Sequence, residues 1–420
     1  MTRKNMGWLI VGLLFVVYML NYMDRMALSH TAGLVKADLG FDDAQMGMIF
    51  SAFFVGYALF NFIGGWAADK IGPVKVFFYA ALAWSIFCGM TGLVDGFLSM
   101  IAVRIAFGMA EGPVSSAGNK IIANWIPRRW CATAVAIFSA GSPLGGAISG
   151  PVVGLLALNF GWRWAFGAIF LMGLVWCLLW WVLAADKPSM SKILAEKERE
   201  DLEHNEDVIV EKSGAGEVVP SLLSYMKQPM VWASTLAFFS YNYILFFFLT
   251  WFPSYLNKAF ELDIKSVAIV TVLPWVIGSI GMVLGGLVSD WIYKLTGDAL
   301  LSRRLILGGA LGSAAICVGI AGTVTTVFAA VALMSVTMFA LYLTGPIYWA
   351  IIQDVVHRDK VGSVGGAMHG LANTSGIIGP AATGFIVQAT GSFAVAFFIA
   401  GGIAILAASL VFVFVKKQKA

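Results

Sequence analysis

The chain has 420 residues, of which 60% are hydrophobic and only 12% are charged. A water-soluble protein of this length could not cover so much apolar surface, so the composition predicts an integral membrane protein. The net charge of +4 at pH 7 is spread over short connections, which argues against a basic nucleic-acid-binding patch, and the four cysteines form no CxxC pair that would suggest a metal centre.

Twelve apolar windows are long enough to cross the roughly 30 Å of hydrocarbon in a bilayer. They lie near residues 7–34, 44–68, 76–94, 98–122, 131–157, 162–184, 229–257, 266–293, 304–323, 326–352, 361–388 and 393–415. The first window lacks a small-residue cleavage site, so we expect a retained helix rather than a signal peptide. The pattern predicts an all-α integral membrane fold of 12 transmembrane helices, arranged as two pseudo-symmetric six-helix bundles at residues 1–184 and 229–420.

The polar stretch at residues 185–228 separates the two sets of windows. It is highly charged and mostly helix-forming up to His204, so we interpret it as a cytoplasmic linker with one surface helix. The Lys and Arg residues of the connections give the orientation. With the N-terminus in the cytoplasm, 20 of them lie inside and four lie outside, namely Lys36, Arg163, Lys258 and Lys265. The positive-inside rule therefore places both termini in the cytoplasm.

The two halves of the chain repeat a short motif. GGWAAD at residues 64–69 ends the second span, and GGLVSD at residues 285–290 ends the eighth, 221 residues later. A Gly-Pro pair recurs similarly, at residues 150–151 and 379–380. Duplication of a six-helix unit in a membrane is typical of a transporter whose binding site lies between the halves.

Two apolar spans of the first half carry ionisable residues, which are costly at membrane depth unless they face a partner or a watery cavity. Arg25 lies on a polar stripe with Tyr22 and offers a planar fork that can hold a substrate carboxylate. Glu111 is the candidate proton carrier, because an anion that occupies Arg25 would leave this acid free to take a proton. The alternative for each residue is a purely structural ion pair.

A depth estimate suggests a second pair. At 1.5 Å per residue, Asp24 lies about 24 Å above Trp8, and Arg104 lies about 9 Å below Leu98. Both positions fall in the outer third of the membrane. The sequence therefore predicts an Asp24–Arg104 ion pair, as a second protonation site, as part of an outer gate, or as a brace between helices.

The second half has no ionisable residue deep in a span other than His369, for which an interhelical hydrogen bond is the expected role. Its amide and aromatic side chains, among them Asn242 and Trp349, suit a hydroxylated substrate with an apolar face. Tyr57 of the second span offers another hydroxyl at similar depth. We expect the first half to handle charge and the second half to recognise hydroxyl groups.

The inner ends of the second and eighth spans carry candidate gating residues. We expect Asp69 and Lys70 to hold the cytoplasmic side closed by pairing and by capping the helix, with Asp290 at the repeated position.

Several motifs resemble those of known transporters. The segment GWAADKIG at residues 65–72 resembles the loop signature of the major facilitator superfamily. More narrowly, the chain resembles the anion:cation symporter family in the motifs NYMDR (21–25), RIAFGMAEG (104–112), NWIP (124–127), TWFPSYL (250–256) and GLANTSGIIGP (370–380). That family includes bacterial proton-coupled carriers of sugar acids such as galactonate and glucarate, with hexuronate, tartrate and phthalate carriers as relatives. The resemblance points to Asn373 as a substrate contact.

Three positions depart from the family pattern. The basic pair after the loop glycine is reduced to Lys75, and the acidic-Arg pair expected after NWIP is Trp130-Cys131. Ser142 stands in the fifth span where galactonate carriers tend to have an amide side chain, which puts the sugar-hydroxyl contacts there in question.

The sequence thus predicts a proton-coupled symporter that imports a small organic anion, a hexonate or hexarate, by alternating access across a bacterial inner membrane. A monomer in the lipid bilayer, without cofactor, metal or nucleic acid, is expected. A carrier of another carboxylate (hexuronate, tartrate, phthalate or another aromatic acid) and a proton-antiport exporter remain as alternatives. A ligand sensor would need an output domain larger than the linker, and an enzyme is disfavoured because no nucleophile, base and orienting group share a plausible site.

Overall fold

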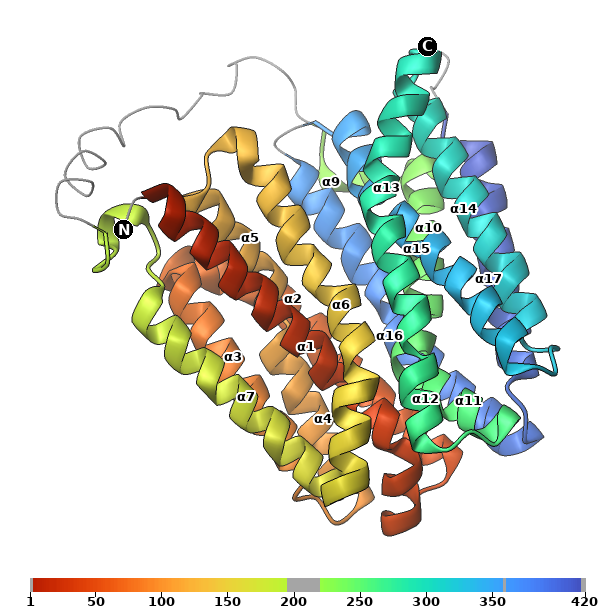
Figure 1. The fold of residues 1–420 in the computed structure, drawn as a ribbon. Helices are drawn as coiled ribbons and strands as arrows, with labels where there is room; N and C mark the ends of the chain where they lie inside the picture. Colours follow the sequence, from red (N-terminus) through yellow and green to blue (C-terminus); the bar gives the residue numbers. More distant parts are fainter. Residues whose placement is uncertain (1–2, 195–219, 358–359, 417–420) are drawn as a thin grey trace.

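The computed structural model describes residues 3–194, 220–357 and 360–416, and within these ranges every regular element is a helix (Figure 1). The predicted surface helix of the linker falls largely outside the described residues. The longer helices of the first half are α1 (Arg3–Leu39), α2 (Asp43–Ile71), α3 (Pro73–Thr91), α4 (Phe97–Glu111), α5 (Val114–Trp125), α6 (Arg128–Phe160) and α7 (Trp162–Leu183), followed by the short η1 (Pro188–Met190).

The second half repeats this arrangement. It contains α9 (Leu222–Met226), α10 (Pro229–Thr250), α11 (Phe252–Phe260), α12 (Ile264–Val270), α13 (Val272–Thr296), α14 (Ala299–Ala321), α15 (Val327–Val355), α16 (Val361–Thr390) and α17 (Ala394–Phe414). Among the described residues, 11 helical stretches are long and apolar enough to span a membrane. Of the helices that match predicted spans, α16 falls outside this set, and it carries polar residues such as His369 and Asn373. The chain is a multi-pass membrane protein with the predicted all-α fold.

Three predicted spans consist of two helices rather than one. The fourth breaks between α4 and α5 at Gly112 and Pro113, the seventh at Trp251 and the eighth at Thr271. At the first break Pro113 directly precedes α5, at the second Pro253 is the second residue of α11, and proline has no N–H to continue the preceding ladder. The break after α4 makes Glu111 the last residue of its helix.

Close backbone contact fixes α4 against α2. A Cβ atom built on Gly108 would lie 1.9 Å from the carbonyl oxygen of Phe53, so only glycine permits this approach. One turn after Gly108, Glu111 is held at full burial on the side of α4 that faces the other helices of the first half.

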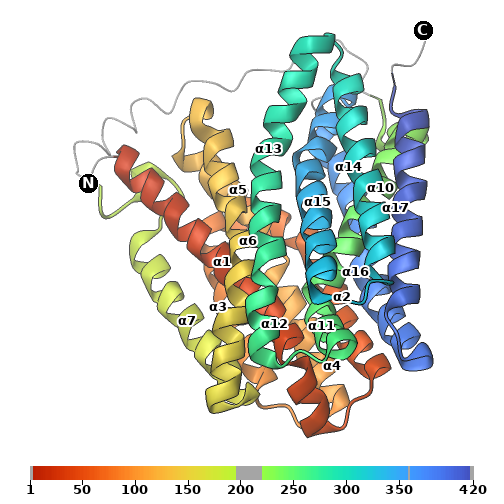
Figure 2. The same cartoon turned by 45° about the vertical axis from the view of Figure 1, so that its right-hand side comes forward.

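The two halves of the chain meet at the end of the molecule opposite the start of α1 and the end of α17 (Figures 1 and 2). We call this the outer end, following the orientation predicted from the Lys and Arg residues of the connections. There the N–H of Ala381 donates to the Ser51 hydroxyl at 2.9 Å, and the hydroxyl of Ser29 donates to the carbonyl oxygen of Thr250 at 2.7 Å. These bonds join α1 and α2 to α10 and α16, so the outer end is closed.

Gly47 lies at the centre of this closed contact. A Cβ atom there would lie 2.7 Å from the Pro380 carbonyl oxygen, so we expect Gly47→Leu to force the outer ends of α2 and α16 apart. In a chain whose four native cysteines are replaced by alanine, a Ser51→Cys reporter should then react about tenfold faster with a membrane-impermeant maleimide, given strain of about 1–3 kcal/mol.

The matched control is Gly286→Leu, since a Cβ atom on Gly286 meets nothing within 4 Å. An unchanged labelling rate in Gly47→Leu would show that the α2–α16 contact does not keep the outer end closed.

Candidate functional site

The centre of the candidate site is an ion pair between α1 and α4. Arg25 donates from Nε to Oε2 of Glu111 at 2.5 Å, and the two side chains are 6% and 0% exposed. The other carboxylate oxygen of Glu111, Oε1, is buried without a hydrogen-bond partner. The structure therefore brings together the two residues that the sequence assigned to substrate charge and to the proton, and leaves one acceptor atom unused.

The predicted Asp24–Arg104 pair is not formed in the structure: no ion pair or hydrogen bond joins these two described side chains. Counted from the outer ends of the helices, Arg25 lies 14 residues before Leu39 and Glu111 lies 14 residues after Phe97, so both are about 21 Å deep. By the same measure Arg104 lies about 12 Å closer to the outer end than Asp24.

The error in the prediction came from the outer end of α1. The predicted span ends at residue 34, whereas the helix continues to Leu39, and its 37 residues span about 55 Å, far more than the hydrocarbon thickness. Distances counted from Trp8 therefore placed Asp24 too close to the outer end.

Asp24 and Arg104 are both buried and both lie within electrostatic range of Cys88 and Glu111, but they do not pair with each other. Asp24 lies near Trp84 and Cys88, and its Oδ1 has no hydrogen-bond partner. The guanidinium of Arg104 lies 5.2 Å from the ring centre of Phe53 and 5.0 Å from that of Phe107, while its Nε and Nη1 donate no hydrogen bond.

Aromatic rings surround the Arg25 guanidinium. Its Cζ lies 5.0 Å from the ring centre of Tyr22, 5.2 Å from that of Phe53 and 4.6 Å from that of Tyr57. Rings at this distance stabilise a cation through the negative charge of their faces. The rings also limit the movement of the guanidinium. It is therefore already positioned to bind a carboxylate while it pairs with Glu111.

The second half contributes side chains from α10, α15 and α16. Asn373 donates from Nδ2 to the His369 carbonyl oxygen at 2.8 Å, and the same nitrogen lies 3.1 Å from Nδ1 of the His369 ring. The ring of Trp349 lies 6.3 Å from that of His369 and is 42% exposed. Asn242 is buried, and its Nδ2 has no hydrogen-bond partner.

Residues of the two halves approach each other through tyrosines. Tyr22 of α1 lies within electrostatic range of Tyr241 of α10, and Tyr342 of α15 lies next to Ser142 of α6 without a hydrogen bond of normal geometry. Tyr22 and Ser142 of the first half thus lie near Tyr241 and Tyr342 of the second half, and the Tyr342 hydroxyl is buried without a hydrogen-bond partner.

Of the predicted gating residues, the structure describes the side chains of Lys70 and Asp290. Lys70 is exposed and its ammonium lies 4.6 Å from the ring centre of Trp66, and Asp290 is exposed. The side chain of Asp69 lies outside the described residues.

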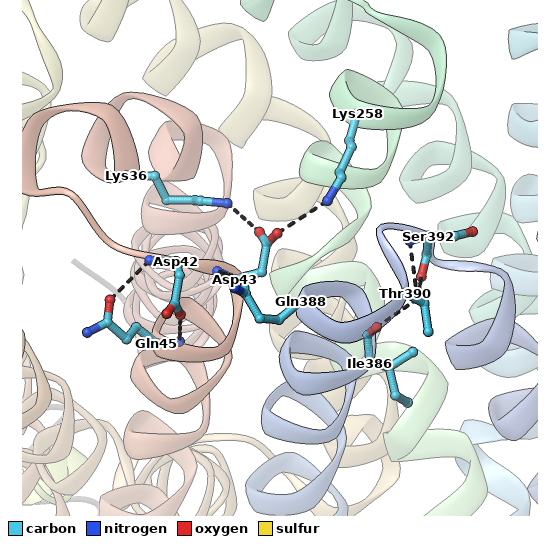
Figure 3. A network of polar contacts seen from close by, with 9 residues as sticks. All are labelled: Lys36, Asp42, Asp43, Gln45, Lys258, Ile386, Gln388, Thr390 and Ser392. Atoms are coloured by element: carbon cyan, nitrogen blue, oxygen red, sulfur yellow. Dashed lines mark hydrogen bonds and ion pairs between the residues drawn. The ribbon is translucent and has the colours of Figure 1, made fainter.

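A network at the outer end was missed by the sequence analysis. The carboxylate of Asp43 on α2 pairs with Lys36 on α1 and, at 3.3 Å, with Lys258 on α11, as Figure 3 shows. The N–H of Asp43 also donates to the side-chain oxygen of Gln388 on α16 at 3.1 Å. The sequence identifies Lys36 and Lys258 only as charges on the outside. The signal that could have revealed the network is Asp43, an acid at the same end of the second span.

No group of three or more His, Cys, Asp or Glu side chains in the described ranges could hold a metal ion. The chemistry at the site is that of buried charges, amides, hydroxyls and aromatic rings.

Comparison with known families gives a match to the Major Facilitator Superfamily model over residues 14–380. The chain belongs to the major facilitator superfamily. This superfamily consists of membrane transporters, so the chain is a transporter and not an enzyme.

The superfamily members most relevant to the site are carriers of sugar acids. The chain is 47% identical over 409 residues to the hexuronate transporter of Bacillus subtilis (strain 168), covering 97% of this chain and 94% of that protein. It is 33% identical over 420 residues to the "Probable galactarate/D-glucarate transporter GarP" of Escherichia coli (strain K12), covering 95% and 92%. The predicted resemblance to the sugar-acid carriers is confirmed.

A solved D-xylose-proton symporter has the same fold, with a TM-score of 0.76, 16% sequence identity and coverage of 96% of this chain and 97% of that chain. This likeness establishes for this chain the 12-helix major facilitator fold that the sequence predicted.

Proposed function

We propose that the protein is a proton-coupled symporter that takes up a sugar acid by alternating access. The observation that carries the proposal is the buried Arg25–Glu111 pair with its unused acceptor, Oε1 of Glu111. A substrate carboxylate that binds Arg25 competes with Glu111 for the same guanidinium. Glu111 then loses its hydrogen-bonded partner, the charge of Arg104 lies near it without an ion pair, and taking a proton lowers the cost of its burial.

This exchange couples the two transported species. With the substrate on Arg25, Glu111 is neutral. The substrate carboxylate then balances the charge of Arg25, so the loaded site carries less net charge than it would with an ionised Glu111. When the substrate leaves, Glu111 loses its proton and pairs again with Arg25. Asp24, whose Oδ1 is also buried and unpaired, is a second candidate proton site near Glu111.

The substrate class follows from the remaining side chains and the relatives. We assign the hydroxyl and ring contacts to Tyr22, Tyr57, Ser142, Asn242, Trp349 and Asn373. These polar tips and aromatic faces suit a polyhydroxylated ring or chain. Since one relative at 47% identity is named a hexuronate transporter and one at 33% a carrier of galactarate and D-glucarate, a hexuronate is the first substrate to test and a hexarate or hexonate the second.

The setting of the transporter is part of the proposal. We place it as a monomer in the lipid bilayer of a bacterial inner membrane, with both termini in the cytoplasm, because this orientation puts 20 of its connecting Lys and Arg residues inside and four outside. We also keep the domain boundaries at residues 1–184, 185–228 and 229–420, with Asp69, Lys70 and Asp290 as gating residues of the cytoplasmic side.

The test is uptake into liposomes that contain the purified protein and an imposed pH gradient, acidic outside. D-glucuronate, D-galacturonate, D-glucarate and D-galactonate should be compared, with benzoate as an aromatic acid and glucose as a neutral sugar. We expect gradient-driven accumulation of at least one sugar acid, abolished by a protonophore, and none of benzoate or glucose.

Accumulation of none of the sugar acids would contradict the proposed function. Accumulation that survives the protonophore but requires sodium would contradict the coupling to protons.

A further inference from the structure

The outer end contains a cavity that the proposed transport site does not use. Its volume is about 630 Å³, and its walls include His30, Gly33 and Lys36 of α1, Asp43 of α2, and Ser254 and Lys258 of α11. We call this cavity the outer vestibule. Its volume falls in the range of roughly 300–1,000 Å³ that is usual for small-molecule sites.

The charges of the vestibule favour an anion. Lys36 and Lys258 share the single carboxylate of Asp43, which leaves one positive charge uncompensated among these three residues. Figure 3 shows both ammonium groups directed at that carboxylate from different helices. The lysine side chains are 30% and 41% exposed, so the charges are reachable from the solvent side.

The cavity also has polar groups and free space. His30 is 7% exposed, and its Nε2 is buried without a hydrogen-bond partner. Ser254 adds a hydroxyl to the wall. A Cβ atom built on Gly33 meets nothing within 4 Å, so the backbone of α1 borders open space there.

We propose that the outer vestibule is a capture site for the carboxylate of a polyhydroxylated organic acid, distinct from the Arg25 site. Lys258 binds the incoming carboxylate in place of Asp43, and the histidine and serine side chains bind hydroxyl groups. This proposal rests on the proposed function for its ligand class, a sugar acid arriving from outside.

The exchange at Lys258 also has a mechanical consequence. The Asp43–Lys258 pair joins α2 of the first half to α11 of the second half, whereas the Asp43–Lys36 pair stays within the first half. An anion that takes over Lys258 leaves Asp43 with Lys36 and removes one link between the halves. Capture of the substrate therefore weakens the closure of the outer end.

The experiment measures binding of D-glucuronate to the purified protein by saturation-transfer NMR and titration calorimetry. Arg25→Ala is the parent, because it removes the proposed transport site and leaves the vestibule. We expect this parent to bind D-glucuronate weakly, and more tightly than it binds acetate, which lacks hydroxyls, or glucose, which lacks the carboxylate.

Two added substitutions should weaken this binding, Lys258→Gln by up to about fivefold, the effect of one partly exposed charge pair. Lys258→Gln removes the cation, and Gly33→Leu fills the cavity without changing any charge. Their matched controls should bind like the parent. Lys265→Gln removes a lysine outside the vestibule, and Gly12→Leu adds a side chain at another position of α1 with nothing within 4 Å.

Asp43→Asn separates capture from a purely mechanical link. This change and Lys258→Gln both break the pair between the halves. A merely structural role of the pair therefore predicts that both changes shift the affinity for D-glucuronate in the same direction. Capture predicts opposite shifts, since Asp43→Asn leaves two uncompensated lysines and should tighten D-glucuronate binding.

Three results would overturn the proposal: no binding to the Arg25→Ala parent, parent-like binding by both Lys258→Gln and Gly33→Leu, or shifts of the same sign in Lys258→Gln and Asp43→Asn. Failure of the wild-type protein to accumulate any sugar acid in liposomes would instead contradict the proposed function. The binding measurements would still decide whether the outer vestibule binds D-glucuronate.

Discussion

Glu111→Gln should abolish accumulation driven by a pH gradient while preserving exchange of substrate across the membrane. Glutamine has nearly the same size and can accept the hydrogen bond that Arg25 donates to Glu111, but it cannot carry a proton. With one proton per substrate, a gradient of about 2 pH units supports accumulation of about 100-fold, since each unit corresponds to about 1.4 kcal/mol. We expect the variant to show no accumulation above the external concentration.

Two measurements on the same liposomes check this expectation. Gradient-driven uptake reports the coupling, and counterflow of labelled against unlabelled sugar acid reports binding and the conformational change without net proton movement. Glu261→Gln, which alters an exposed carboxylate, is the matched control and should behave like the wild type. Accumulation by Glu111→Gln at the wild-type level would rule out Glu111 as the coupling residue.

Arg25→Lys should raise the KM for the sugar acid about tenfold or more, since a charge-assisted hydrogen bond contributes about 1.5–3 kcal/mol. Lysine keeps the positive charge but loses the planar fork that binds both carboxylate oxygens. It also loses the stacking of the guanidinium within the rings of Tyr22, Phe53 and Tyr57. Counterflow at several substrate concentrations separates this rise in KM from a fall in maximal rate.

The effect of Arg25 on stability needs its own measurement. Arg25→Ala leaves Glu111 buried without its partner, and breaking a buried pair in this way costs about 3–5 kcal/mol unless the acid is protonated. The double variant Arg25→Ala/Glu111→Gln should therefore be more thermostable than Arg25→Ala alone while remaining inactive.

A wild-type KM in Arg25→Lys would show that the guanidinium does not bind the substrate.

The positions of the helices could be predicted closely because apolar windows of membrane length leave little freedom. The breaks at Gly112, Trp251 and Thr271 could not, since each interrupts a continuous apolar stretch whose composition alone gives one span. The contacts of Asp43 at the outer end could not be predicted for another reason. Asp43, Lys258 and Gln388 are far apart in the sequence and meet only when the two halves close.

By itself, the sequence determined that this protein is a membrane transporter with two repeated halves, and that Arg25 and Glu111 are the charges to examine. Buried ionisable residues are so costly in a membrane that their presence is informative without a structure. Only the tertiary structure decided which charges pair. The real ends of α1 and α4, and the close contact at Gly108, place Arg25 and Glu111 at one depth and leave Asp24 and Arg104 unpaired.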